Sequence, residues 1–252
     1  MRLLSAFRIS LLAITTLTLF SCSNKTETFV TDKLSDYIPL QTGKYITYRL
    51  DSLVFTNFGA VTVTRRYQMK HIVDAQITDN LGRPSYRIYT YIRDSAGTQP
   101  WTASGSYFIT PLATQVEVTD DNLRVIKLHL PIKEGFDWRG NSYLPDNPYS
   151  PAYEFNNDND IQSWDFTYDT FEPAYSYRGN SYTNVYTVLE QDENSNAPVT
   201  NPAVYGYKTL ALDKYAKNIG LVYRKYELWD YQTDPTVHYT GFGITLWMID
   251  HN

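Results

Sequence analysis

The sequence predicts an all-β protein, and three observations carry that prediction. Residues that favour a pleated, half-buried strand are abundant, because aromatic side chains make up 15% of the chain and 23 residues are tyrosine. A long stretch at 61–77 alternates between apolar and polar residues. Clusters of Gly, Pro, Asn and Asp separate the strand-like stretches, and we find no convincing amphipathic helix beyond the N-terminal segment. We therefore expect a single β domain over 37–252, built as a curved antiparallel sheet of half-barrel or sandwich-like form with long strands.

The stretch 61–77 gives the clearest pattern in the chain. Val61, Val63, Tyr67, Met69 and Val73 fall on one face, and the other face is mostly polar. Seventeen residues at about 3.4 Å each would reach about 60 Å, which is much longer than a usual strand. We expect this strand to curve, to carry a β-bulge or to break in two.

The remaining strands follow from shorter runs of the same kind. They are expected at 44–55, 85–93, 101–109, 114–118 and 123–130, and again at 164–171, 182–190, 203–215, 219–231 and 239–250. The residues 120–122 (Asp-Asp-Asn) read as a hairpin tip. Between the two groups, 131–160 is rich in Pro, Gly, Asn and Asp and is expected to be a long irregular loop or lid.

The N-terminal segment has the three regions of a secretory signal. Arg2 and Arg8 give it a positive start, an apolar run follows from Ile9 to Phe20, and Ser21 is the small residue before a cleavage point. About 12 apolar residues at 1.5 Å each reach roughly 18 Å, which is too short for the roughly 30 Å hydrocarbon core of a bilayer. A stable transmembrane helix is therefore the weaker interpretation.

The same segment ends on Leu19-Phe20-Ser21-Cys22, which resembles a bacterial lipobox. The resemblance implies that 1–21 is a lipoprotein signal peptide, that Cys22 carries lipid, including palmitate, and that 22–36 is a flexible tether. Ser23 is not the aspartate that retains many such proteins at the inner membrane, so the outer membrane is implied and the leaflet stays open. The alternative is an ordinary secreted protein with a chance cysteine near its cleavage site.

Charge and cysteine content exclude several classes of function. Removal of 1–21 takes away two arginines and no acid, so the net charge falls from −5 to −7. No basic patch is visible, which argues against nucleic acid as a partner. Cys22 is the only cysteine, so the chain has no disulfide and no cysteine metal site.

Two clusters resemble a family of uncharacterised outer-membrane lipoproteins of the Bacteroidota. The first is Tyr37-Ile38-Pro39-Leu40 followed by 43–48 (Gly-Lys-Tyr-Ile-Thr-Tyr), and the second is 215–223 (Tyr-Ala-Lys-Asn-Ile-Gly-Leu-Val-Tyr). The resemblance implies a curved antiparallel sheet, such as a half-barrel, and it transfers no catalytic residue. Tyr45 stands where the family commonly has tryptophan.

Motifs for chemistry are weak. The sequence Arg-Gly-Asn-Ser-Tyr occurs at 139–143 and at 178–182, and each copy begins like a nucleophile elbow but lacks the final glycine. The four histidines have no metal-ligand spacing. The acidic run at 156–160 could offer oxygen ligands to Ca²⁺, although a solvated loop is favoured. Asp165, Asp169 and Glu172 could support glycoside hydrolysis only if two of them face each other.

We therefore predict a non-enzymatic cell-envelope lipoprotein without a cofactor or metal, which contacts the membrane through Cys22 and binds an apolar or amphipathic ligand or a protein partner. The candidate ligand face carries Val61, Val63, Tyr67, Met69 and Val73, although ordinary core is the more common role of such a face. The alternative is a surface glycan-binding module whose aromatic side chains stack on sugars. Its candidates, all from the 131–160 loop, are Trp138, Tyr143, Tyr149 and Tyr153. A secreted hydrolase of unrecognised family is the third reading.

Overall fold

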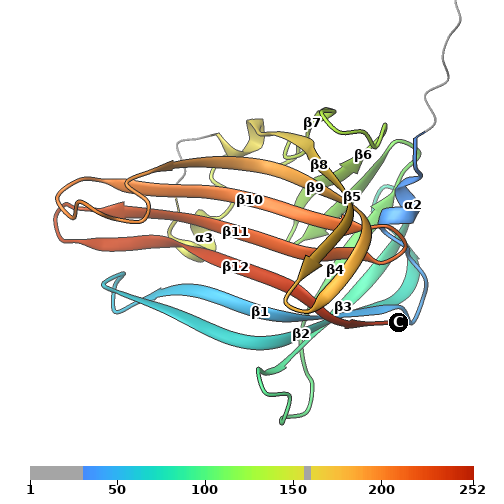
Figure 1. Ribbon diagram of the computed structural model, residues 1–252, viewed down its shortest axis with the longest axis horizontal. Helices are drawn as coiled ribbons and strands as arrows, with labels where there is room; N and C mark the ends of the chain where they lie inside the picture. Colours follow the sequence, from blue (N-terminus) through green and yellow to red (C-terminus); the bar gives the residue numbers. More distant parts are fainter. Residues whose placement is uncertain (1–30, 156–159) are drawn as a thin grey trace, which may run out of the picture. The chain divides into compact units, whose positions relative to one another are not determined.

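The computed structural model describes residues 31–155 and 160–252, and they form one twelve-stranded antiparallel sheet (Figure 1). The predicted all-β class is confirmed. The strands are β1 (Tyr45–Thr56), β2 (Val61–Thr78), β3 (Pro84–Asp94), β4 (Thr102–Pro111), β5 (Gln115–Asp120), β6 (Leu123–His129), β7 (Asp137–Arg139), β8 (Asp165–Tyr177), β9 (Asn180–Ser195), β10 (Gly206–Ala216), β11 (Gly220–Gln232) and β12 (His238–His251). The short helical turns are α2 (Leu34–Tyr37), α3 (Ser150–Tyr153) and η2 (Ile161–Ser163).

The strand order makes the sheet a meander that almost returns to its start. It runs β6-β5-β4-β3-β2-β1-β12-β11-β10-β9-β8-β7, so the first and last strands pair in the middle and the two outermost strands are β6 and β7. The gap between β6 and β7 is bridged, since the Ile126 N–H donates to the Gly140 carbonyl at 2.8 Å and the Trp138 indole N–H donates to the Ile126 carbonyl at 2.8 Å. The predicted curved sheet is thus nearly closed.

The long second strand curves through a bulge, as its length required. The register between β2 and β3 shifts between Val73 and Ala75, so Asp74 is the extra residue of the bulge. A bulge increases the local twist and bends the strand. An 18-residue strand can therefore follow a curved sheet without breaking.

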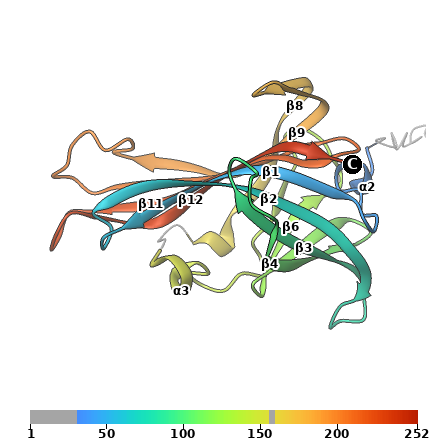
Figure 2. The ribbon, with the colours of Figure 1, turned by 90° about the horizontal axis from the view of Figure 1, so that it is seen from below.

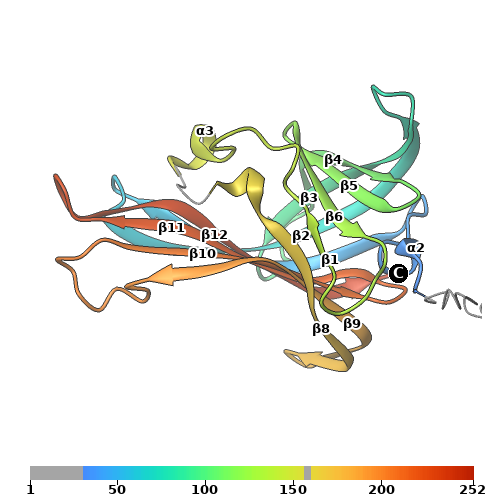
Figure 3. The same ribbon diagram turned by 90° about the horizontal axis from the view of Figure 1, so that it is seen from above.

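The two ends of the sheet differ in their surroundings. The loops of the β1–β2, β9–β10 and β11–β12 hairpins lie together at one end, on the left of Figures 1, 2 and 3, and α2 lies at the other. Near the middle, α3 lies on one side of the central strands and the tip of the β8–β9 hairpin lies on the opposite side (Figures 2 and 3).

The main core fills the inside of the curved sheet. Phe166, Tyr168 and Val188 have no exposed surface, and the Trp138 ring lies 4.7 Å from the Tyr168 ring and 5.9 Å from the Phe166 ring. Burying an aromatic side chain contributes roughly 1.5–3 kcal/mol from apolar area alone. A second cluster around Tyr48, Val185, Val222 and Met248 packs beside the first.

Part of the predicted tether is packed on the sheet. The Ile132 N–H donates to the Thr31 hydroxyl at 2.8 Å, the Lys217 ammonium donates to Asp32 at 2.5 Å, and α2 starts at Leu34. The predicted boundary at residue 37 therefore falls inside α2, while Cys22 lies outside the described residues. In the part of the chain that the structure describes, no helix is long and apolar enough to cross a membrane.

The two Arg-Gly-Asn-Ser-Tyr copies serve different structural purposes. The second copy forms the β8–β9 hairpin turn, where Arg178 and Gly179 both have positive φ. In the first copy Gly140 follows β7, and an added Cβ would lie 2.3 Å from the Phe166 ring, so glycine is required there for close packing. Neither copy forms the sharp strand-to-helix turn of a nucleophile elbow, because the second joins two strands and the helix that follows the first, α3, begins only at Ser150.

Candidate functional site

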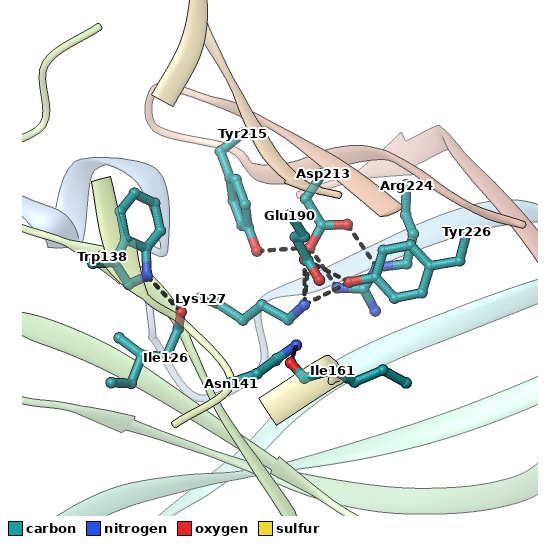
Figure 4. Close-up of polar contacts among 10 residues, drawn as sticks. All are labelled: Ile126, Lys127, Trp138, Asn141, Ile161, Glu190, Asp213, Tyr215, Arg224 and Tyr226. Carbon is teal, nitrogen blue, oxygen red and sulfur yellow. Dashed lines mark hydrogen bonds and ion pairs between the residues drawn. The ribbon is translucent and has the colours of Figure 1, made fainter. Parts of the chain in front are cut away.

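Four charged side chains meet inside the curved sheet and form a buried polar cluster (Figure 4). The Lys127 ammonium of β6 donates to Glu190 of β9 at 2.5 Å and lies 3.7 Å from Asp213 of β10. Arg224 of β11 holds Asp213 with two hydrogen bonds, at 2.7 and 2.6 Å. The Tyr226 hydroxyl donates to Glu190 at 2.7 Å. We call Lys127, Glu190, Asp213 and Arg224 the ion cluster.

Local strand geometry brings these side chains to one face. Asp213 and Arg224 are directly opposite each other in the β10–β11 ladder, and side chains of such a pair share a face. Glu190 lies at a bulge, because Leu189 pairs with Leu212 whereas Gln191 pairs with Ala211. Lys127 comes from the outermost strand on the other side of the gap. The ion cluster therefore links β6 to the wall formed by β9, β10 and β11.

Burial and charge act in opposite directions on the two carboxyl groups. Asp213 is completely buried, but the positive charges of Arg224 and Lys127 outweigh that burial and hold its pKa below the usual range. Burial raises the pKa of Glu190 even though Lys127 lies beside it. Two positive and two negative groups balance, and a buried set of charges is tolerated only when each group has its partners. The arrangement is suited to holding the sheet closed.

A neutral histidine lies near the ion cluster. The ring Nδ1 of His71 and the Tyr107 hydroxyl are 3.0 Å apart, and His71 packs edge-on against Tyr48. Burial, assisted by the charge of Arg224, lowers the pKa of His71 to about 3. The imidazole is therefore uncharged at neutral pH.

The structure corrects the predicted role of one aromatic residue in the 131–160 loop. Trp138 lies in the core, 7% exposed, and its indole N–H is bonded to Ile126, so its ring is not free to stack on a sugar. Tyr149 and Tyr153 pack against Phe242 at 5.4 and 4.1 Å between ring centres. Tyr143 is 50% exposed, with the Arg124 guanidinium 5.3 Å from its ring centre.

The predicted apolar face of β2 divides between core and surface. Val73 is buried in the main core, and Tyr67 and Met69 are partly buried against the second cluster. Val61 is 45% exposed at the hairpin end, and Val63 is half-buried. Two hollows of about 310 and 300 Å³ lie elsewhere, beside the β2–β3 turn and beside the β8–β9 hairpin tip.

Two of the three candidate acids have basic partners. Asp165 lies 3.5 Å from Arg139, and Glu172 is paired with Lys214. Within residues 31–155 and 160–252, no group of three or more His, Cys, Asp or Glu could hold a metal ion. The predicted calcium ligands at 156–159 lie outside the described residues.

Sequence reasoning did not single out the ion cluster. A signal was present, since Lys127 and Asp213 each interrupt an apolar run, Val125-Ile126-Lys127-Leu128 and Leu210-Ala211-Leu212-Asp213. A charge inside such a run predicts a buried partner. The identity of that partner could not be derived, because Lys127 and Glu190 are 63 residues apart.

A second feature is the open edge of β4. On the side away from β3, β5 pairs only with Phe108–Pro111, so Thr102–Tyr107 has no strand beside it there. Thr102, Ala103, Ser104, Gly105 and Ser106 are all exposed. Among the described residues, no backbone hydrogen bond from a turn or loop reaches this segment. Proteins commonly protect an exposed edge strand from pairing with charged residues, prolines or β-bulges. The segment Thr102–Tyr107 contains no charged residue and no proline, and its one such feature is a β-bulge at Ser104.

No protein-family model and no curated protein matches the chain. Among solved structures, it is similar to a "putative exported protein with YmcC-like fold" from Bacteroides fragilis, at 11% identity and a TM-score of 0.38, over 83% of this chain and 97% of that one. It is also similar to a "putative lipoprotein" from Parabacteroides distasonis, at 10% identity and a TM-score of 0.34, over 82% and 96%. A DUF1329 family protein from Desulfovibrio piger gives 12% identity and a TM-score of 0.21, over 86% and 88%. Likeness at this level carries no argument about the function of this chain.

Proposed function

We propose that the protein is a lipoprotein of the bacterial cell envelope, held at the outer membrane by lipid on Cys22, that binds a protein partner and catalyses no reaction. The observation that carries the proposal is the open edge of β4. An edge strand presents unpaired N–H and C=O groups, which an extended segment of another protein can pair with as an added strand.

The composition of the edge supports this mode of binding. All its side chains are uncharged, and those of 102–106 are also small, so that charge and bulk do not oppose an incoming strand there. Pro100 and Pro111 flank the open segment and lie outside the stretch that an added strand would pair with. The six residues Thr102–Tyr107 match the length of a usual strand.

The interior supports binding over catalysis. The buried carboxyl groups of Glu190 and Asp213 are held by Lys127 and Arg224, and their charges are used in closing the sheet. The apolar-ligand version of the function is less well supported, because Tyr67, Met69 and Val73 pack against core. Glycan binding retains Tyr143 and Tyr153, which are 50% and 42% exposed, as aromatic candidates and loses Trp138.

The anchor is tested by metabolic labelling with an alkyne analogue of palmitate. We expect label on the full chain and none on the Cys22→Ser variant. Protease treatment of intact and lysed cells then distinguishes the cell surface from the periplasm. An unlabelled chain that leaves cells as a free protein would refute the anchor.

The partner site is tested by a photo-crosslinking amino acid placed at Ser104 in intact cells. We expect a discrete adduct from position 104 and none from position 98, which lies in the neighbouring β3–β4 turn. Lysine at Ala103 and Ser106 should remove the adduct while the thermal unfolding curve stays unchanged, because charged side chains block edge pairing. Equal cross-linking from both positions, or no adduct from either, would refute docking at the β4 edge.

A further inference from the structure

The hairpin end of the sheet carries a group of exposed apolar side chains. Phe58 is 98% exposed, Val237 is 52% exposed, and Val204 and Tyr205 are 48% and 44% exposed. They come from three loops, 57–60, 196–205 and 233–237, which lie at the same end of the sheet in Figures 1, 2 and 3. We call Phe58, Val204, Tyr205 and Val237 the tip surface.

Contacts beneath the tip surface tie the three loops together. The Tyr239 N–H donates to the Gly59 carbonyl at 2.9 Å, which joins the β1–β2 loop to β12. The Tyr239 ring lies 5.0 Å from the Tyr231 ring, and the Tyr231 hydroxyl donates to the Pro202 carbonyl at 3.0 Å. The three loops that carry the exposed apolar side chains are therefore joined to one another through Tyr231 and Tyr239.

The β1–β2 loop has an unfavourable backbone conformation, and the side chain of its Phe58 is exposed. Asn57 and Phe58 have φ values of 53° and 54°, and Gly59 has a φ of 80°. A bulky residue rarely adopts positive φ, and such strain persists where the surrounding structure enforces it, often at functional sites. Here Gly59 fixes the turn, because a Cβ at that position would lie 2.3 Å from the Tyr239 carbonyl oxygen. Scattered exposed apolar residues are common, but a strained turn that projects a whole phenyl ring is not explained by chance exposure.

The charge of the three loops indicates what they contact. Asp234 is the only charged residue in 57–60, 196–205 and 233–237, and none of the three contains lysine or arginine. An anionic surface would be repelled by the mature chain, whose net charge is −7, whereas a neutral, zwitterionic lipid surface would not. Aromatic and aliphatic side chains on loop tips suit the boundary between headgroups and acyl chains.

We propose that the tip surface inserts into the interface of a zwitterionic phospholipid bilayer and gives the protein a second membrane contact besides its lipid. Phe58 is the principal inserting side chain, and Val237, Val204 and Tyr205 surround it. This contact is independent of partner binding at the β4 edge.

The test uses the mature chain 22–252 with Cys22→Ser, which removes the lipid and the only native thiol. The apolar run 9–20 is left out because it would bind vesicles by itself. A thiol-reactive, polarity-sensitive fluorophore is placed at Val237→Cys, and vesicles of phosphatidylcholine and phosphatidylethanolamine are added. We expect the emission to shift to the blue, rise several-fold and be quenched by brominated acyl chains. The same fluorophore at Leu81→Cys, in the exposed β2–β3 turn at the other end of β2, should not respond.

Substitution of Phe58 sharpens the test. Phe58→Asp should reduce co-flotation with these vesicles about tenfold, whereas Leu81→Asp, which also removes an exposed apolar side chain, should leave it unchanged. Adding phosphatidylglycerol should not strengthen binding. The proposal is overturned if the Val237→Cys probe does not respond, or if Leu81→Asp and Phe58→Asp act equally. Failure with vesicles together with Phe58-dependent cross-linking to a protein in cells would assign the tip surface to a protein partner instead.

Discussion

Where β6 and β7 approach each other, side chains from both ends of the strand order meet in one core, whereas at the hairpin end each strand contacts little beyond its own neighbours. Phe166, Tyr168 and Val188 have no exposed surface in the first region, and Phe58 and Val237 are more than half exposed in the second. The difference teaches that closure of the sheet provides the packing, and that the open end is left available for contacts with other surfaces.

Among the variants that compare the two regions, Trp138→Ala should cause the largest loss in the free energy of unfolding. The indole contacts Phe166 and Tyr168 and bonds to β6, so its removal leaves a cavity at the closure and should lower the free energy of unfolding by about 3–5 kcal/mol. Urea denaturation, monitored by circular dichroism, measures this free energy of unfolding. Tyr143→Ala, in the same loop but half exposed, should change the free energy of unfolding by less than about 0.5 kcal/mol. Similar losses from both variants would contradict the assignment of Trp138 to the core.

Lys127→Met should lower the free energy of unfolding by nearly as much as Trp138→Ala. It leaves Glu190 and Asp213 buried with one positive charge fewer, and breaking a buried pair typically costs about 3–5 kcal/mol. The matched control is Arg139→Ala, which removes an exposed ion pair with Asp165 and should cost only about 0–1 kcal/mol. If Lys127→Met unfolds at the same urea concentration as the parent chain, the ion cluster does not hold the closure.

Acid should lower the free energy of unfolding, because the pKa of His71 is lowered in the folded chain. The pKa of His71 is about 3 in the folded chain and near 6.5 when unfolded, so between these values the unfolded chain binds more protons. The free energy of unfolding should therefore fall as the pH decreases from 6.5 towards 3. The lowered pKa of Asp213 adds a further loss as the pH falls through its folded-state pKa, while the raised pKa of Glu190 acts in the opposite sense.

Urea midpoints at pH 7, 5.5 and 4.5 separate the contribution of His71. His71→Gln should flatten the decline between pH 6.5 and 4.5, because glutamine does not titrate. His251→Gln, at an exposed position near the C-terminus, should keep the slope of the parent chain. An unchanged slope in His71→Gln would show that other groups control the acid response.

The smallest effect is expected at the open end. Val61 begins β2 beside the tip surface and is 45% exposed, so Val61→Ala should change the free energy of unfolding by less than about 0.5 kcal/mol. Amide hydrogen exchange should be faster in β1 and β2 near 56–61 than in β9 near Val188. A loss above 2 kcal/mol, or equal exchange at both places, would remove the distinction between the two regions.

Much of the strand layout could be predicted from local sequence. The expected strands at 85–93 and 219–231 match Pro84–Asp94 and Gly220–Gln232 closely, and the expected hairpin tip at 120–122 joins β5 to β6. β8 and β9 were predicted less accurately, because they extend well beyond 164–171 and 182–190. Their outer residues form a hairpin that packs on the central strands, and Tyr182 reaches the Met248 carbonyl there. Such extension depends on a surface that the local pattern does not describe.

The candidate sites were less accessible to sequence reasoning than the strands. The 131–160 loop was expected as a lid with exposed aromatic side chains, yet its Trp138 lies in the core and its chain contributes β7 to the sheet. A tryptophan among Gly and Asn has the same local context whether it is buried or exposed. Only the position of β6, which receives its indole N–H, decides between the two.

The sequence by itself determined the all-β class, the positions of most strands and the need for a bend in β2, because these depend on the period of apolar residues and on turn chemistry within a few residues. The tertiary structure decided that β1 pairs with β12, that the gap between β6 and β7 is bridged, and that Lys127 meets Glu190 and Asp213. It also decided which edge and which loops remain uncovered. These features depend on contacts between residues far apart in the chain, and their free energy is not encoded in any short stretch.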